Sequence, residues 1–188
     1  MKKIAITGSL ASGKTSASKI LSLNKGPLFS ADYVVKELYR KKFFRKIISK
    51  KFNIPNILSI KKVLKRRILR DKKKLILLEK IIHPLVRKEM KKFISLNKSK
   101  KFLFFEIPLL VESNLMRKFD IIIFIKSNKS KRLQRFVSKG GNKKLFNMLN
   151  KKQLPDFKKI KYCDYVIVNN KDLKFLKKNL SGILRKYE

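Results

Sequence analysis

The chain has 188 residues, a length that suits one α/β domain with an inserted cap. Its one cysteine, Cys163, excludes an intramolecular disulfide and a cysteine-based zinc site, and we expect a reducing cytoplasm as its compartment. It has no apolar run of about 18 residues and no signal-peptide pattern, so we expect no membrane partner. The formal net charge of +39 comes from basic residues spread along nearly the whole chain together with many Ile, Phe and Asn, which indicates a compositional bias and weak polyanion binding, with no specific nucleic-acid function.

A phosphate-binding loop follows the first predicted strand, the apolar run at 3–7. Its G-x-x-x-x-G-K-[ST] spacing lets backbone N–H groups wrap a phosphate, and a helix predicted over 11–23 adds its dipole. Lys14 is placed to reach the β- and γ-phosphates of ATP, and the Thr15 hydroxyl to ligate Mg²⁺. The predicted ATP-binding residues are Gly8, Ser9, Leu10, Ala11, Ser12, Gly13, Lys14, Thr15 and Ser16.

An all-helical block follows the second predicted strand. The expected segments are a Gly26-Pro27 turn, a strand at 28–30, a helix at 33–51, a break at 53–56, a helix from about Ser59, and a third helix that ends near His83-Pro84 or continues with a kink to Leu96. The block has the size of an inserted substrate-binding cap.

The remaining chain returns to alternating strands and helices. The expected segments are a buried strand at 102–105 ending in Glu106, a strand at 121–125 opened by Asp120, a helix at 130–139, a lysine-rich, mobile segment from Gly140 to about Lys152, a strand at 165–168 and a closing helix at 173–187. This alternation predicts a parallel sheet covered on both faces.

Two carboxylates follow predicted strands at the edge of the sheet that holds the phosphate loop. Asp32 is placed to accept the proton of an acceptor hydroxyl, or else to cap the next helix. Glu106 is placed to help hold Mg²⁺ through water, or else is a strand-end charge before Pro108.

The basic segment from Lys131 to Lys139, after the fourth predicted strand, is either a candidate lid that folds cations over the phosphates or a solvated face. Arg132 and Arg135 are favoured over the lysines because guanidinium groups match phosphate geometry better. His83, the chain's one histidine, is either a functional residue or a satisfied residue at the end of a helix.

Several segments taken together resemble the dephospho-coenzyme A kinase family over nearly the full length. They are the ITG-x-x-x-SGKT opening, Ser30-Ala31-Asp32, the block from Leu78 to Val86, the block from Ile107 to Glu112, Leu133-Gln134-Arg135, Gln153, and the block from Cys163 to Asn169. The L-E-x-I-x-H-P-L-V and P-L-L-x-E patterns in this order are specific, whereas the phosphate loop alone is shared by many enzymes.

The resemblance implies an α/β, three-layer phosphate-loop NTPase fold with a five-stranded parallel sheet. It implies a single kinase domain with a core at 1–32, 100–134 and 160–188, a helical coenzyme A cap at about 33–99 and a lid at about 135–155. The implied reaction transfers the γ-phosphoryl of ATP, with Mg²⁺, to the ribose 3′-hydroxyl of dephospho-coenzyme A, and we expect a monomer.

The resemblance also assigns roles to individual residues. It implies Asp32, Lys14 and Arg135 as catalytic and Asn169 as a neighbour of the adenine. It places the acceptor against Asp32, His83, Pro108, Leu109 and Glu112.

Three positions depart from the family pattern. Ser30 stands in place of a first aspartate, Lys139 in place of the second lid arginine, and Lys61 in place of a cap arginine. Lysine keeps the charge but loses the planar fork of arginine.

Two other functions stay open from the sequence. One is another small-metabolite or nucleoside monophosphate kinase of the same fold. The other is a basic nucleic-acid-binding protein that uses ATP incidentally.

Overall fold

The computed structural model describes residues 1–55 and 60–187 of the chain, which divides into two compact units. One unit combines Met1–Ser30 with Asn97–Glu188, and the other is Ala31–Leu96. Within the described ranges, no helix combines the length and apolar character needed to cross a membrane. We describe each unit separately.

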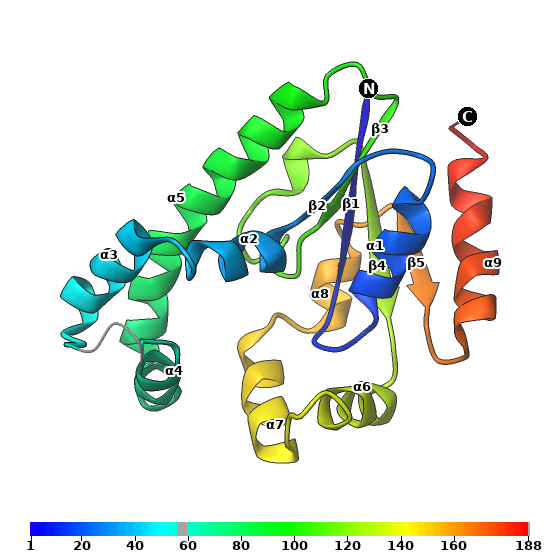
Figure 1. The fold of residues 1–188 in the computed structure, drawn as a ribbon. Helices are drawn as coiled ribbons and strands as arrows, with labels where there is room; N and C mark the ends of the chain where they lie inside the picture. Colours follow the sequence, from blue (N-terminus) through cyan, green and yellow to red (C-terminus); the bar gives the residue numbers. More distant parts are fainter. Residues whose placement is uncertain (56–59, 188) are drawn as a thin grey trace. The chain divides into compact units, whose positions relative to one another are not determined.

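A five-stranded sheet forms the centre of the first unit (Figure 1). All of its paired strands are parallel, in the order β2-β3-β1-β4-β5. The strands are β1 (Lys2–Gly8), β2 (Leu28–Ser30), β3 (Phe102–Glu106), β4 (Ile121–Lys126) and β5 (Tyr165–Val168). The apolar runs that predicted β1, β3 and β4 are buried in this sheet, whereas Val166 and Val168 of the edge strand β5 are exposed. The predicted α/β fold is confirmed.

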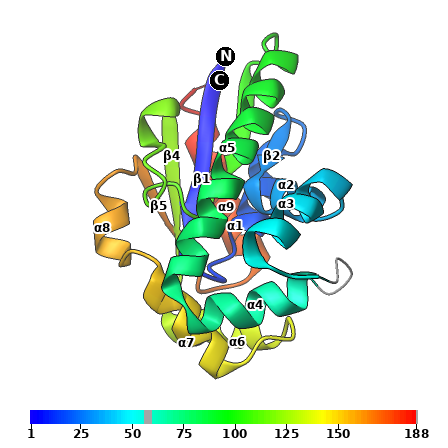
Figure 2. The same ribbon diagram turned by 90° about the vertical axis from the view of Figure 1, so that its left-hand side faces the viewer.

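Helices cover both faces of this sheet. Helices α1 (Lys14–Ser22) and α9 (Leu173–Leu184) lie on one face, and the short α8 (Asp156–Ile160) lies on the other, against β4 (Figures 1 and 2). The core between the sheet and the α1–α9 face is built from Ile4, Ile6, Phe104, Ile123, Ala17, Leu21, Leu176 and Leu180. Alternate residues of β1 supply this core, as the two-residue period of a strand requires.

The connections between strands change side between β1 and β3, which makes this the reversal point of the sheet. The connection after β1 leads to β2 on one side, whereas the connection after β3 leads to β4 on the other side of β1. Open α/β sheets bind ligands in the crevice at the carboxyl ends of such strands. The register pairs Ile6 with Glu106, so the phosphate loop and Glu106 meet at this point.

The second unit contains four helices within its described residues. They are α2 (Ala31–Leu38), α3 (Lys42–Phe52), α4 (Ile60–Arg70) and α5 (Lys72–Leu96). Their shared core includes Leu38, Phe44, Ile48, Phe52 and Leu64.

The predicted single helix over 33–51 is wrong, because the chain turns at 39–41 between α2 and α3. Leu38 and Phe44 would point about 120° apart on one continuous helix, yet both are buried in the same core. The turn allows this, and it also packs the Tyr39 ring edge-on against Phe44 at 5.0 Å between centroids.

Helix α5 settles the alternative that the sequence left open at Pro84. It continues through this proline to Leu96, although the proline lacks the N–H of a regular helical hydrogen bond. The predicted break begins at Asn53, which ends α3 in the left-handed conformation with φ of 49°. Asn56 and the predicted helix start near Ser59 lie outside the described residues.

The lysine-rich segment after α6 (Lys129–Val137) differs from the expectation of a mobile stretch. Residues Lys143–Lys152 form a regular helix, α7, whose first turn is capped by Asn142 Oδ1, accepting the Leu145 N–H at 2.8 Å. Phe146 of α7 is fully buried and packs against Phe136 of α6, with 5.7 Å between ring centroids. Helix α8 was not predicted, and α9 ends at Leu184, short of the predicted Tyr187.

Candidate functional site

The phosphate loop lies between β1 and α1, at the carboxyl end of the central strand. Gly8 and Gly13 adopt φ of 149° and 98°, which L side chains rarely adopt. A β-carbon on Gly8 would collide with the Ile125 carbonyl oxygen, and one on Gly13 would collide with the Asn169 amide. Both glycines of the motif are therefore required by backbone conformation and by close approach.

Lys14 opens α1 and reaches back across the loop. Its side chain is buried, and Nζ donates a 2.9 Å hydrogen bond to the Ser9 carbonyl. The N–H groups of the first turn of α1 have no partners within the helix and favour an anion at this end. Lys14 is thus positioned within the loop that the sequence predicts to bind phosphate.

Thr15 and Glu106, the two predicted magnesium-side residues, are in direct contact. Thr15 Oγ1 donates a 2.5 Å hydrogen bond to Glu106 Oε1, and Ser30 Oγ donates a 3.1 Å bond to Glu106 Oε2. Glu106 is 3 % exposed. Hydroxyl and carboxylate oxygens are the hard donors that Mg²⁺ prefers, so the donor set at the end of β1 and β3 fits this ion.

Arg135 and Asn169 meet at the opposite part of the loop. Asn169 Nδ2 donates to the Ser12 carbonyl at 2.8 Å, and Arg135 Nη1 donates to the same oxygen at 3.3 Å. Arg135 Nη2 also donates to the Asn169 carbonyl at 3.0 Å. The structure therefore joins α6 and the chain after β5 to the phosphate loop, while the role of Arg135 over the transferring phosphoryl stays a prediction.

The predicted acceptor residues of the segment after β3 make contacts of their own. The Pro108 carbonyl accepts a 3.3 Å hydrogen bond from Thr7 Oγ1, and the Leu109 carbonyl accepts one from the Ser113 N–H at 2.9 Å. These bonds fix the course of the chain beside the end of β1. Binding of the acceptor by this segment stays a prediction.

Glu112 forms an ion pair that the sequence did not reveal. Its Oε1 lies 2.6 Å from Nζ of Lys159, which is 0 % exposed, and accepts the Leu154 N–H at 3.1 Å. Lys159 stands within a lysine-rich stretch, where one more lysine carries no signal of burial. The pair gives Glu112 a structural role beside its predicted one.

Asp32 and His83 belong to the second unit. Asp32 lies in the first turn of α2, which begins at Ala31, so it is inside the helix and not at the position that precedes it. His83 is half-buried in α5, directly before Pro84. Their roles as base and acceptor contact stay predictions.

Lys61 of the same unit lies over the Tyr39 ring, with Nζ 5.3 Å from the centroid. Burial raises the pKa of the Tyr39 hydroxyl to about 12. A cation over this face has a favourable contact with the ring. The lysine that departs from the family pattern therefore has a packing role here.

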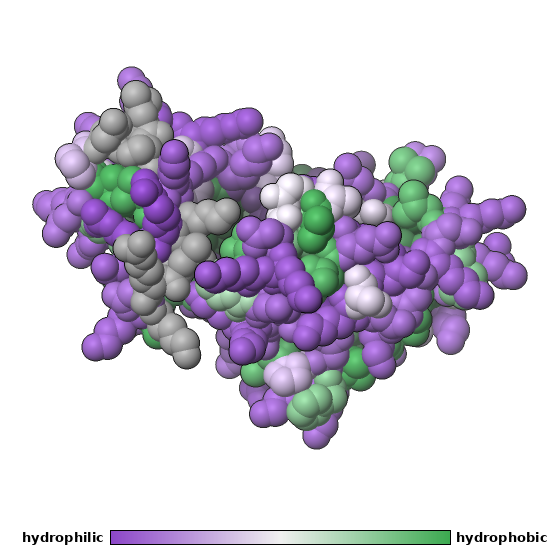
Figure 3. All heavy atoms as spheres, turned by 90° about the horizontal axis from the view of Figure 1, so that it is seen from below, coloured by the Kyte–Doolittle hydropathy of each residue, from purple (hydrophilic) through white to green (hydrophobic). Residues whose placement is uncertain are grey.

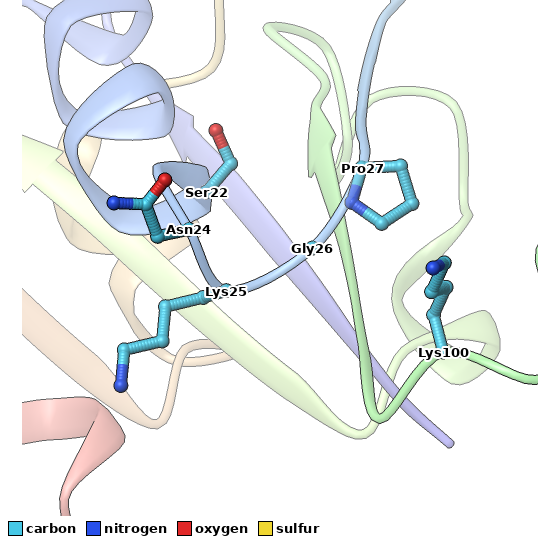
Figure 4. A pocket seen from close by; sticks show the side chains of 6 residues that line it. All are labelled: Ser22, Asn24, Lys25, Gly26, Pro27 and Lys100. Carbon is cyan, nitrogen blue, oxygen red and sulfur yellow. The ribbon is translucent and has the colours of Figure 1, made fainter.

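A pocket of about 470 Å³ lies at the other end of the sheet, where β2 and β3 begin (Figure 4). Its lining includes Lys25, Gly26 and Lys100. Figure 4 shows the side chains of Lys25 and Lys100 extending in different directions. They do not converge on one ligand position, and the pocket is separate from the phosphate loop.

The parallel sheet, its reversal point and the loop between β1 and α1 together define a phosphate-loop kinase fold. The family model of dephospho-CoA kinase matches residues 2–174. Dephospho-CoA kinase of Bartonella quintana is 36% identical over 180 residues, covering 92% of this chain and 91% of that protein. The chain belongs to the dephospho-CoA kinase family.

Solved structures agree on the fold. A Thermus thermophilus protein aligns with a TM-score of 0.84 at 23% identity, covering 100% of this chain and 98% of that one. Dephospho-CoA kinase from Campylobacter jejuni aligns with a TM-score of 0.70 at 22% identity, covering 98% and 96%.

Proposed function

We propose that this chain transfers the γ-phosphoryl of ATP to the ribose 3′-hydroxyl of dephospho-coenzyme A, giving coenzyme A and ADP. The observation that carries the proposal is the formed phosphate loop, with Thr15 on Glu106, in a chain that matches the dephospho-CoA kinase family over residues 2–174. The reaction places the protein among phosphotransferases with an alcohol acceptor. The cytoplasm and a monomeric state remain our predictions.

On the nucleotide side, the loop from Gly8 to Ser16 holds the phosphates of ATP. Lys14 Nζ exchanges its bond to the Ser9 carbonyl for a phosphate oxygen, because a phosphate offers the ammonium a stronger, charge-assisted partner. Asn169, bonded to Ser12, lies beside the adenine.

Thr15 and Glu106 are the residues that would hold the Mg²⁺ that accompanies ATP. The metal would supply charge neutralisation at the phosphate oxygens. Buried Glu106 is kept in place by the hydroxyls of Thr15 and Ser30. Ser30 therefore supports this carboxylate from the position where the family pattern has an aspartate.

On the acceptor side, Asp32 orients the 3′-hydroxyl and accepts its proton. The 3′-oxygen forms a bond to the γ-phosphorus as the bond from that phosphorus to the bridging oxygen of ADP breaks. His83, Pro108, Leu109 and Glu112 shape the acceptor site, and Arg135 stabilises the charge of the transferring group. Positioning and charge stabilisation supply most of the catalysis in such transfers.

Product analysis tests this proposal. Incubation with Mg-ATP and dephospho-coenzyme A should yield ADP and coenzyme A in equal amounts, separated by chromatography and identified by mass. An analogue that lacks the ribose 3′-hydroxyl should yield neither product above the ATPase background. Equal turnover of the two acceptors would show that the phosphoryl group is transferred to a group other than the ribose 3′-hydroxyl.

A further inference from the structure

The backbone of Leu10, in the first half of the phosphate loop, is held from both sides by side chains of the 132–156 region. Gln153 Oε1 accepts the Leu10 N–H at 2.9 Å, and Arg132 Nη1 donates to the Leu10 carbonyl at 3.4 Å. The neighbouring Ser9 hydroxyl donates to Asp156 Oδ1. The Leu10 backbone and the Ser9 hydroxyl are thus bound by a distant part of the chain.

Arg132 is itself fixed in place. It is 7 % exposed, and Nε donates to the Ser127 carbonyl at 3.1 Å while Nη1 donates to Asn150 Oδ1 of α7 at 2.7 Å. Its guanidinium lies 5.7 Å from the centroid of the Phe146 ring, and burial lowers its pKa. A guanidinium held by these partners is a rigid support for the loop carbonyl.

Gln153 directly follows α7, whose last residue is Lys152. The chain beyond it is anchored by the buried ion pair of Lys159 and Glu112, and Glu112 also accepts the Leu154 N–H. The Gln153 oxygen is therefore presented to Leu10 by a segment that is tied down on both sides.

Loops that wrap a phosphate lose conformational freedom when they bind it, so a loop ordered beforehand binds more tightly. Ser9 and Leu10 precede the residues at the helix start and lie outside the α1 hydrogen-bond ladder. The Ser9 carbonyl is bonded locally, by the Ser12 N–H and Lys14 Nζ, whereas the Leu10 backbone is bonded by the distant Gln153 and Arg132.

We propose that Gln153 and Arg132 are positioning residues that clamp the backbone of Leu10 on its N–H and C=O sides and so preorganise the phosphate loop for nucleotide. Neither needs to touch the nucleotide. For Arg132 this differs from the lid role that the sequence favoured, because its guanidinium is buried and bonded to Ser127 and Asn150. The inference rests on the proposed function only in requiring that the loop bind a nucleotide phosphate, and it is independent of the acceptor.

The test is a double-mutant cycle on the affinity for Mg-ADP, measured by titration calorimetry without any acceptor. Gln153→Met removes the acceptor oxygen, and Arg132→Met removes the donor. Each should weaken Mg-ADP binding about tenfold. The affinity loss of the double variant should be far smaller than the product of the two single losses, because the two side chains hold the successive peptide groups on either side of the Leu10 α-carbon.

Matched controls lie on the exposed side of α6. Lys131→Met removes one positive charge next to Arg132, and Gln134→Met makes the same chemical change as Gln153→Met, both at exposed positions. Both control variants should bind Mg-ADP like the unaltered protein.

Unchanged Mg-ADP affinity in the Gln153 and Arg132 variants, with only a lower melting temperature, would assign them a purely structural role and overturn the proposal. Fully additive losses would also overturn it. If the unaltered protein does not phosphorylate dephospho-coenzyme A but the Mg-ADP affinities of the variants change as expected, the proposed function is refuted. The proposal for Gln153 and Arg132 would still hold.

Discussion

Thr15 Oγ1, in the first turn of α1, donates a 2.5 Å hydrogen bond to Glu106 Oε1 at the end of β3. This bond joins the phosphate loop to the neighbouring strand at the reversal point of the sheet. It places a hydroxyl and a buried carboxylate in direct contact. We predict that this pair forms the magnesium side of the proposed reaction.

Glu106→Gln should raise the Mg²⁺ concentration needed for half-maximal turnover by about tenfold, because an amide oxygen is a weaker partner for a cation than a carboxylate. Initial rates measured against Mg²⁺ at saturating ATP check this. Asp120→Asn is the control, because Asp120 precedes β4 at the opposite end of the sheet and its amide can still accept the Lys3 N–H. An unchanged Mg²⁺ requirement in Glu106→Gln would remove Glu106 from the metal side.

The Glu112–Lys159 pair should matter for stability. Glu112→Ala leaves Lys159, which is 0 % exposed, without its counter-charge, and breaking a buried pair in this way costs about 3–5 kcal/mol. Glu112→Leu combined with Lys159→Met removes both charges and should recover much of the loss. Urea unfolding measures the free energies of unfolding of the unaltered protein, of Glu112→Ala and of the double variant. A double variant as unstable as Glu112→Ala would contradict this account.

Cys163 should react slowly with iodoacetamide in the folded protein. Burial and the nearby Asp164 raise the pKa of its thiol to about 11, against the opposing effect of Lys159, and thiolate is the reactive form. Alkylation at pH 8 should be at least about tenfold slower than in urea. Equal rates in the two states would show that the thiol is not protected.

The raised pKa of the Cys163 thiol should also make the stability of the protein depend on pH. The folded pKa of Cys163 lies above the ordinary value of 9.0, so the folded state holds the proton more tightly. This contribution is fully present below pH 9 and is lost as the pH rises toward 11. Cys163→Ser should flatten the fall in melting temperature over this window while leaving turnover nearly unchanged.

The charge of +39 should make stability depend on salt. Hydrophilic side chains dominate the face drawn in Figure 3, and self-repulsion among cations is screened by added salt. The melting temperature should rise between low and physiological ionic strength.

Binding to single-stranded DNA should weaken steeply with added salt and should not depend on the DNA sequence. Tight, sequence-selective binding at physiological salt would instead favour the nucleic-acid alternative.

The sheet and the phosphate loop could be predicted because their signals are local. Short apolar runs rich in β-branched residues, such as Ile121–Ile125, are typical of a buried strand, and the spacing of the loop's glycines has a steric cause. The turn between α2 and α3 was missed because it depends on Leu38 and Phe44 sharing a core, which helical periodicity does not encode.

Other contacts lay beyond the sequence for the same reason. The bond from Leu10 to Gln153 joins residues 143 positions apart, and the burial of Lys159 follows from its pairing with Glu112. Asn142 before α7 was a usable capping signal, but the surrounding lysines suggested a solvated, mobile stretch.

The central claim is tested most directly by a coupled ADP-release assay with Mg-ATP and dephospho-coenzyme A, run beside AMP, CMP and adenosine as acceptors and repeated with Asp32→Asn. We expect turnover with dephospho-coenzyme A alone, and a loss of orders of magnitude in the variant because the 3′-hydroxyl then lacks its base. Turnover with another acceptor, or near-normal turnover in Asp32→Asn, would contradict the account.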